Sequence, residues 1–180
     1  IGLDEVCISR WRRIASASSR ANRLITDLLD FTQARLGGGL RVTPASLDLH
    51  ALVADCVEEL KLVWEGRMIQ QLRSGEGLVY ADADRLLQVV TNLATNALTY
   101  GTATHPVTIT SAIAPDELRI MVHNYGPAIP EALMPHLFEP LRRGEQQVKL
   151  GSRSVGLGLY IVQEIARAHG GNVSVQSDRE

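Results

Sequence analysis

The sequence predicts an α+β fold, in which a two-layer α/β sandwich follows one long helix. Residues 4–36 contain no proline or glycine and repeat apolar side chains every seven positions, which is the pattern of a long amphipathic helix. Three glycines at 37–39 then interrupt that pattern. Beyond them, short apolar or alternating runs are interleaved with helical patterns, which favours helices stacked on one face of a sheet.

The long helix at 1–36 is expected to dimerise. Its repeating positions are Cys7, Ile14, Ala21 and Leu28. Trp11 and Ile25 widen this apolar face to the breadth that is typical of a four-helix bundle. Because one helix cannot bury its own apolar face, we expect a homodimer through this segment.

The elements after the glycines are expected in a fixed order. They are a strand at 40–46, a helix at 49–63, strands at 68–72 and 77–80, a helix capped by Asp82 or Asp84 and running to Tyr100, an antiparallel hairpin at 106–113 and 117–123, a helix at 156–169 and a strand at 172–176.

Composition excludes several classes of protein. The 180 residues are 45% hydrophobic and carry a net charge of −2 with mixed signs, so we expect no nucleic-acid partner. Cys7 and Cys56 lie far apart and outside any CxxC pair, which indicates reduced cytoplasmic thiols and no zinc site. Since no apolar run approaches about 20 residues, we expect no membrane contact by this segment.

The helix that ends near Tyr100 carries a row of polar side chains. Gln88, Asn92, Asn96 and Tyr100 follow one another at intervals of four residues. Asparagine is a mediocre helix former, so its use here is easier to explain if the amide oxygens serve a ligand or a hard cation. A solvated helix face is the alternative.

Two glycine motifs accompany this row. In the stretch 124–130, Gly126 allows backbone to approach a planar group closely, and Asn124 offers an amide. In the stretch 154–159, two glycines open a helix whose free N–H groups can receive phosphates. A dinucleotide fingerprint is not matched, because Ile161 stands where its third glycine is needed.

The order of these motifs, with Leu-Phe-Glu-Pro at 137–140 between them, resembles the N, G1, F and G2 boxes of sensor histidine kinases. That family lies within the GHKL group, with gyrase, mismatch-repair ATPases and a heat-shock chaperone. The segment 23–31 is similar to the second helix of the family's dimerisation and phosphotransfer hairpin. The resemblance implies a partial bundle helix at 1–36, a linker and first strand at 37–47, and an ATP-binding catalytic domain at 48–180 whose last strand is missing.

The resemblance also implies site residues for ATP and Mg²⁺. Asn96 would ligate the magnesium and Asn92 would lie beside it, both as catalytic residues. Hydrolysing members carry a glutamate at the position of Asn92, so an amide there favours phosphotransfer over hydrolysis. The implied ATP-binding residues are Asn92, Asn96, Tyr100, Asn124, Gly126, Ile129, Arg142, Arg143, Gly156, Leu157, Gly158 and Leu159.

The chain departs from the family pattern at several positions. These are Thr99, Asn124, Ala128, Leu141 and Ser154, where a basic residue, an aspartate, a glycine, an aromatic residue and a glycine are usual. They leave open a degenerate domain that acts as a dimerising scaffold. Another GHKL ATPase or serine kinase is a further alternative, although the long helix argues for a histidine kinase.

The phosphoacceptor histidine that the resemblance implies is not in this chain. All five histidines follow residue 39. We therefore expect the acceptor upstream of Ile1, in a larger protein, with the phosphate passed on to the receiver domain of a response regulator in the cytoplasm.

Overall fold

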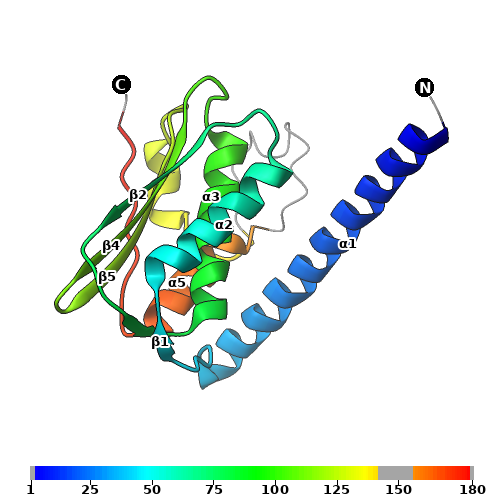
Figure 1. Cartoon of the computed structure of the whole chain (residues 1–180). Helices are drawn as coiled ribbons and strands as arrows, with labels where there is room; N and C mark the ends of the chain where they lie inside the picture. Colours follow the sequence, from blue (N-terminus) through cyan, green and yellow to red (C-terminus); the bar gives the residue numbers. More distant parts are fainter. Residues whose placement is uncertain (1–2, 142–155, 179–180) are drawn as a thin grey trace.

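The computed structural model describes residues 3–141 and 156–178, apart from some side chains within 3–20. Helix α1 (Leu3–Gln33) ends in a short π-helical turn, η1 (Ala34–Gly38), where Gly37 adopts a φ of 87° that breaks the helix. Figure 1 shows α1 projecting away from the remaining elements, with only its C-terminal end against them. The predicted long helix is confirmed.

A three-stranded sheet has the order β2-β4-β5, formed by β2 (Ile69–Ser74), β4 (Val107–Ala114) and β5 (Glu117–His123). The β4–β5 hairpin is antiparallel, as expected. The β2–β4 pair is parallel, with Ile69 opposite Val107. A helix connects these two strands and brings the chain back to the same end of the sheet, which makes the pair parallel.

A separate two-stranded sheet pairs β1 (Ala45–Leu47) with β3 (Val79–Ala81) in antiparallel orientation. Both strands are shorter than the predicted runs or shifted from them. The small sheet lies at the base of the domain, beside the end of α1 (Figure 1).

Helices α2 (Leu49–Val63) and α3 (Ala83–Tyr100) cover one face of the larger sheet, which confirms the predicted α+β class (Figure 1). Asp48 caps α2 through the backbone N–H of Ala51, and Asp82 caps α3 through that of Arg85. The buried core between helices and sheet includes Leu49, Val53, Val57, Val90, Leu98, Val107 and Ile109. Helix α3 also packs against α5 (Gly158–Ala168).

A second apolar cluster joins the end of α1 to α3 and α5. Its buried members are Leu40, Val89, Leu157, Ile161, Val162 and Ile165. Phe31 of α1 packs edge-on against Tyr160 of α5, with ring centroids 5.7 Å apart. The long helix is therefore docked on the domain by its last two turns.

The predicted strand at 172–176 is wrong, because the structure assigns no strand there. Val173 packs against the second apolar cluster, and the Ser177 hydroxyl accepts a hydrogen bond from the Ile129 N–H at 2.9 Å. Within the described residues no backbone ladder partner lies beside this segment, so apolar side chains alone do not make it a strand.

A short 3₁₀-helix, η2 (Glu131–His136), follows β5. Across residues 3–141 and 156–178, none of the helices combines the length and the apolar character needed to cross a bilayer.

Candidate functional site

Helix α3 carries the row of polar side chains that the sequence singled out. The side of α3 that faces the core holds Val90, Ala94 and Leu98, all at most 1% exposed. With this side fixed against the sheet, Asn92 and Asn96 fall on successive turns of another side, and Tyr100 ends the helix. The sequence prediction of one apolar and one amide-rich side is confirmed.

The N-terminus of α5 lies against Asn92. The Asn92 Nδ2 donates to the Gly158 carbonyl oxygen at 3.4 Å, and Asn92 is 8% exposed. A Cβ on Gly158 would lie 3.6 Å from the Asn92 carboxamide. The fold therefore joins two of the predicted motifs, the asparagine row and the glycine-opened helix.

Asn96 keeps its side-chain amide free, since no hydrogen bond joins it to any residue that the structure describes. Its side chain is half-buried, one turn beyond Asn92. An amide oxygen without a protein partner is a suitable ligand for a hard divalent cation. The donor chemistry of this part of the site thus fits magnesium.

The loop after β5 is seated on the C-terminal end of α3. A Cβ on Gly126 would lie 2.9 Å from the Tyr100 carbonyl oxygen, closer than real Cβ atoms come. The Thr102 N–H donates to the Tyr125 carbonyl at 2.6 Å. Glycine is therefore required at 126 by the space available, and the loop and helix end form one unit.

Asn124 lies in the same unit. A Cβ on Gly101 would lie 3.1 Å from the Asn124 Cβ, and the Asn124 Nδ2 donates to the Tyr125 carbonyl at 3.4 Å. Its carboxamide oxygen accepts no hydrogen bond from the described part of the chain and remains available as an acceptor.

The other predicted site residues are placed less uniformly. Leu157 is buried in the second apolar cluster, where it supports the start of α5, and Leu159 is half-buried. The Ile129 N–H is bound to Ser177. Gly156 adopts a φ of 78°, and its carbonyl accepts from the Leu141 N–H at 3.0 Å. Arg142 and Arg143 lie outside the described residues, as does Ser154.

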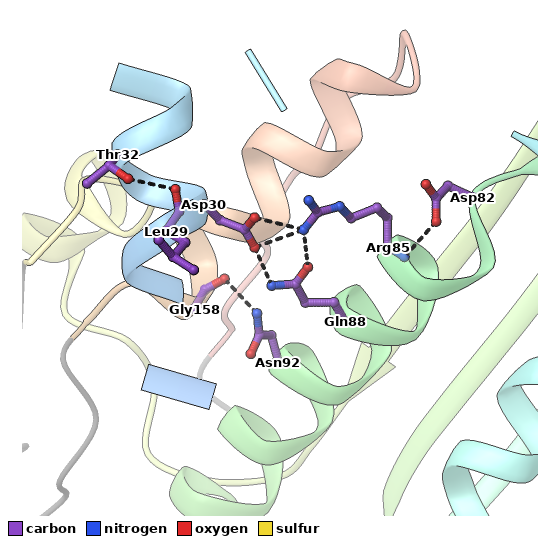
Figure 2. A network of polar contacts seen from close by, with 8 residues as sticks. All are labelled: Leu29, Asp30, Thr32, Asp82, Arg85, Gln88, Asn92 and Gly158. Carbon is purple, nitrogen blue, oxygen red and sulfur yellow. Dashed lines mark hydrogen bonds and ion pairs between the residues drawn. The ribbon is translucent and has the colours of Figure 1, made fainter. Parts of the chain in front are cut away.

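Gln88 is used differently from the other polar side chains of α3. Its Nε2 donates to the Asp30 carboxylate of α1 at 2.8 Å, and its Oε1 accepts from the Arg85 Nη1 at 2.9 Å. Figure 2 shows this group next to the Asn92–Gly158 contact, with Asp30 pointing from α1 towards Arg85 and Gln88. We call Asp30, Arg85 and Gln88 the docking triad.

A second carboxylate lies beside the docking triad. Asp27 is 8% exposed. The pKa of Asp27 is raised, mainly by burial and further by the nearby Asp30 charge. The Arg23 charge and the hydrogen bond from the Gln88 amide lower this pKa in part. The end of α1 thus holds two neighbouring buried carboxyl groups, and burial together with the Asp30 charge disfavours ionisation of Asp27.

Sequence reasoning missed the docking triad, although signals for it exist. Arg85 stands in the first turn of α3, where the helix dipole disfavours a cation, so an acidic partner was to be expected. Asp27 and Asp30 also stand in the most strongly apolar part of the long helix. Neither signal says which acid meets which base.

Asp82 joins three parts of the chain at the start of α3. Its carboxylate accepts from the Thr43 N–H at 2.7 Å and from the Arg85 N–H at 3.1 Å, while its own N–H donates to His169 Nε2 at 3.1 Å. Desolvation alone would raise the pKa of Asp82, but the hydrogen bonds from Thr43 and Arg85 together hold it below its ordinary value of 3.8.

Comparison with known proteins shows a family match over the part of the chain that contains α3 and α5. The family model described as histidine kinase-, DNA gyrase B- and HSP90-like ATPase matches residues 81–180. A bacteriophytochrome of Pseudomonas aeruginosa is 34% identical over 164 residues, covering 91% of this chain and 22% of that protein. The Mycobacterium tuberculosis protein named Probable sensor histidine kinase TcrY is 34% identical over 166 residues, covering 92% of this chain and 34% of that protein.

Solved structures show the same fold. The catalytic domain of the histidine kinase ThkA is 28% identical, with a TM-score of 0.57 over 69% of this chain and 80% of that one. Full-length ShkA in complex with AMPPNP gives a TM-score of 0.69 at 24% identity, over 94% of this chain and 36% of that one. The match to ShkA extends the similarity to nearly the whole chain, at the level of fold.

Proposed function

Because the chain belongs to the histidine kinase-, DNA gyrase B- and HSP90-like ATPase family, we propose that it binds ATP between α3 and the start of α5 and transfers the γ-phosphate to a protein histidine. The observation that carries this proposal is the approach of Gly158 to Asn92, because it sets the N–H groups at a helix start beside amide side chains. The chain spans 22% and 34% of the two curated relatives above, so the activity of the whole protein is part of the proposal.

Magnesium belongs to this proposal through Asn96. Asn96 would hold Mg²⁺ by its free amide oxygen, with Asn92 beside it, and the cation would supply neutralisation of the phosphate charge. The protein groups would hold the triphosphate in the orientation that transfer requires. Positioning of this kind is the main contribution of protein groups to phosphoryl transfer.

The other end of α3 would receive the purine base. Gly126 packs closely on the Tyr100 backbone and so sets the position of the loop, and the free carboxamide oxygen of Asn124 would accept a hydrogen bond from the adenine amine. A neutral amide makes a weaker acceptor than a carboxylate. We therefore propose adenine recognition without charge assistance.

Transfer to a histidine is favoured over hydrolysis by the chemistry at position 92. An asparagine amide cannot act as a general base towards water. Two histidines of this chain are also engaged in the fold: His50 Nδ1 lies 2.7 Å from the Ser111 hydroxyl, and His169 bridges Asp82 and the Ile165 carbonyl. The acceptor would be a histidine outside residues 1–180, and the next acceptor an aspartate in a response-regulator receiver domain, in the cytoplasm.

Dimerisation through α1 completes the proposal. Trp11 is 70% exposed and Ile14 is 60% exposed, and Ile25 and Leu28 continue the same apolar face at 57% and 55%. Side chains of this size seldom form a continuous exposed stripe without a partner. A second copy of α1 would cover them.

A degenerate, scaffold-only domain is the second candidate. Asn124 stands in place of the family's aspartate and Ala128 in place of its glycine, so two of the departures from the family pattern lie on the base side of the proposed site. Under this alternative the fold and the dimer persist without magnesium-dependent nucleotide binding.

Calorimetric titration with a non-hydrolysable ATP analogue, with and without Mg²⁺, separates the two candidates. We expect magnesium-dependent binding by the native chain and its loss in Asn96→Ala. Asn22→Ala, the same change at an exposed position of α1, is the matched control and should bind normally. Folded native protein that does not bind, or an Asn96→Ala variant that binds unchanged, contradicts the proposed site.

A further inference from the structure

Arg67 lies between α2 and β2, yet its guanidinium reaches the C-terminal end of α3. Its Nη1 donates to the Leu98 carbonyl oxygen at 2.5 Å, and its Nη2 donates to the Gly101 carbonyl oxygen at 3.2 Å. These two acceptors belong to the last turn of α3 and to its C-cap. Arg67 therefore binds carbonyl groups that the helix itself leaves without partners.

Helix α3 contains no residue of its own that could interact with its C-terminal carbonyl groups as Arg67 does. Its last turn contains no basic residue, and its C-cap Gly101 is extended (φ −73°, ψ 148°), so the usual left-handed glycine cap is not formed. A cation at a helix C-terminus interacts favourably with the helix dipole. Arg67 supplies that cation from a separate part of the chain.

The backbone on both sides holds Arg67 in place. Its own N–H donates to the Trp64 carbonyl at 3.1 Å, and the carbonyl of the next residue, Met68, accepts from the Val107 N–H at 2.9 Å. Its Nε is buried without a hydrogen-bond partner among the described residues. Since an incompletely satisfied cation is costly to bury, the contacts to Leu98 and Gly101 have to offset that cost.

The carbonyl groups that Arg67 holds belong to the segment on which the loop after β5 rests. A Cβ on Gly101 would lie 3.1 Å from the Asn124 Cβ, and the Tyr100 carbonyl is the atom that a side chain at 126 would strike. A shift of this helix end by a few tenths of an ångström would move the surface against which 124–126 pack.

We propose that Arg67 is a positioning residue that sets the base-binding end of the nucleotide site through the C-terminus of α3. The inference deepens the proposed function and depends on it. Among the described residues, the hydrogen bonds of the Arg67 guanidinium all go to backbone carbonyl groups, so it acts through the end of α3 and the 124–126 loop. Asn92 lies about 12 Å further along the helix, so the phosphate and metal end should be affected little.

The test compares nucleotide affinity in Arg67→Met, Arg67→Lys and Arg73→Met. Methionine keeps much of the length of the side chain but removes the cation, and lysine restores a cation without the fork that reaches two carbonyls. Arg73 lies six positions after Arg67, within β2, and is exposed, which makes it the matched control. Dissociation constants for non-hydrolysable ATP and GTP analogues with Mg²⁺ are measured well below the unfolding temperature.

In Arg67→Met we expect affinity for the ATP analogue to fall about fivefold to tenfold, because two hydrogen bonds to the end of α3 are lost and only part of their free energy reaches the nucleotide site. We also expect the preference for ATP over GTP to shrink. Arg67→Lys should recover part of the ATP affinity and part of the preference for ATP over GTP. Arg73→Met should match the native chain in both. A role in stability alone would lower the unfolding temperature and leave the dissociation constants of the folded protein unchanged.

Unchanged ATP affinity in folded Arg67→Met, or equal losses for both nucleotides, would overturn the inference. If Arg67→Met does not fold, Arg67→Lys decides: native affinity and native ATP preference in that variant would also overturn it. Failure of the native chain to bind either analogue counts against the proposed function, which separates the two outcomes.

Discussion

Asp30 of α1 and Arg85 of α3 form an ion pair across the junction between the long helix and the catalytic domain. Arg85 Nη1 lies 2.9 and 2.8 Å from the two carboxylate oxygens, and the side chains are 20% exposed for Arg85 and 7% for Asp30. Gln88 binds the same carboxylate, so the pair is fixed from two sides. Figure 2 shows this ion pair, which together with the Phe31–Tyr160 contact defines one docked position of α1.

Arg85→Met should release this position. It leaves a buried carboxylate with only the Gln88 amide as partner, and we expect a loss of about 2–3 kcal/mol in docking free energy. This value is below that of a fully buried pair because Arg85 is partly exposed. Faster amide hydrogen exchange in the last two turns of α1 is the measurement.

The double variant Asp30→Asn/Arg85→Met is the control for that result. Removing the charge together with its partner should cost less than the sum of the single changes. Additive costs would show that Asp30 and Arg85 do not interact, and the described pair would not exist in solution.

Asp27→Asn should change how stability depends on pH. Because the pKa of Asp27 is raised on folding, the native state binds more protons than the unfolded chain above the ordinary value of 3.8. Stability is then lost as pH rises through the raised pKa. We expect the variant to match the native chain well below pH 3.8 and to exceed it near neutral pH, by urea denaturation.

Asp55→Asn, at an exposed position of α2, is the control for the Asp27 variant and should not give this pattern. A lower stability of Asp27→Asn than of the native chain at neutral pH would contradict the argument.

Asp82→Ala should destabilise the catalytic domain by about 1–2 kcal/mol, because it removes the N-cap of α3 together with the tether to Thr43. The pKa of Asp82 is lowered on folding, so its contribution is present above pH 3.8 and is lost as pH falls through the lowered value. Denaturation at several pH values measures both effects. Asp84→Ala, in the same turn but exposed, should cost less at every pH.

The sequence allowed the elements around the site to be predicted because their signals are local. Asp82 as cap, the asparagine row and the glycines before α5 all lie within a few residues of the structure they determine. The partner of Gln88 could not be predicted, since Asp30 lies 58 positions away and the heptad pattern placed α1 against a second copy instead.

Arg67 illustrates the same limit. Its acceptors are 31 and 34 residues ahead, and a single arginine before a strand carries no signal of that contact. The prediction of a strand at 172–176 was wrong for a different reason. Alternating side chains show that a segment can form a strand, but a neighbouring strand has to be present to pair with it.

Leu28→Asp should abolish dimerisation. In the proposed dimer each copy buries one Leu28, worth about 1.5–3 kcal/mol per side chain, and a symmetric interface loses this twice. Light scattering should then give the mass of one chain. Leu78→Asp, at another exposed apolar position, should leave the mass unchanged; a native chain that is monomeric, or a Leu28→Asp variant that still dimerises, would contradict the proposed use of α1.

Gly126→Ala and Gly158→Ala should behave differently, although both glycines belong to the proposed site. A Cβ at 126 would lie 2.9 Å from the Tyr100 carbonyl, so the loop or the helix end has to move, at a cost of about 1–3 kcal/mol. A Cβ at 158 would lie 3.6 Å from Asn92, an ordinary contact, and alanine is favoured over glycine in a helix. Gly158→Ala should therefore be at least as stable as the native chain.

Nucleotide binding by the same two variants distinguishes an effect on protein packing from a direct contact with the nucleotide. If phosphate groups approach the backbone at the start of α5, a methyl group at 158 should weaken binding of the ATP analogue in a protein that is fully stable. Gly126→Ala should weaken binding and stability together, because one displacement causes both. Full affinity in Gly158→Ala would mean that the nucleotide does not approach the start of α5 closely, and the phosphate site would then have to lie elsewhere along α3.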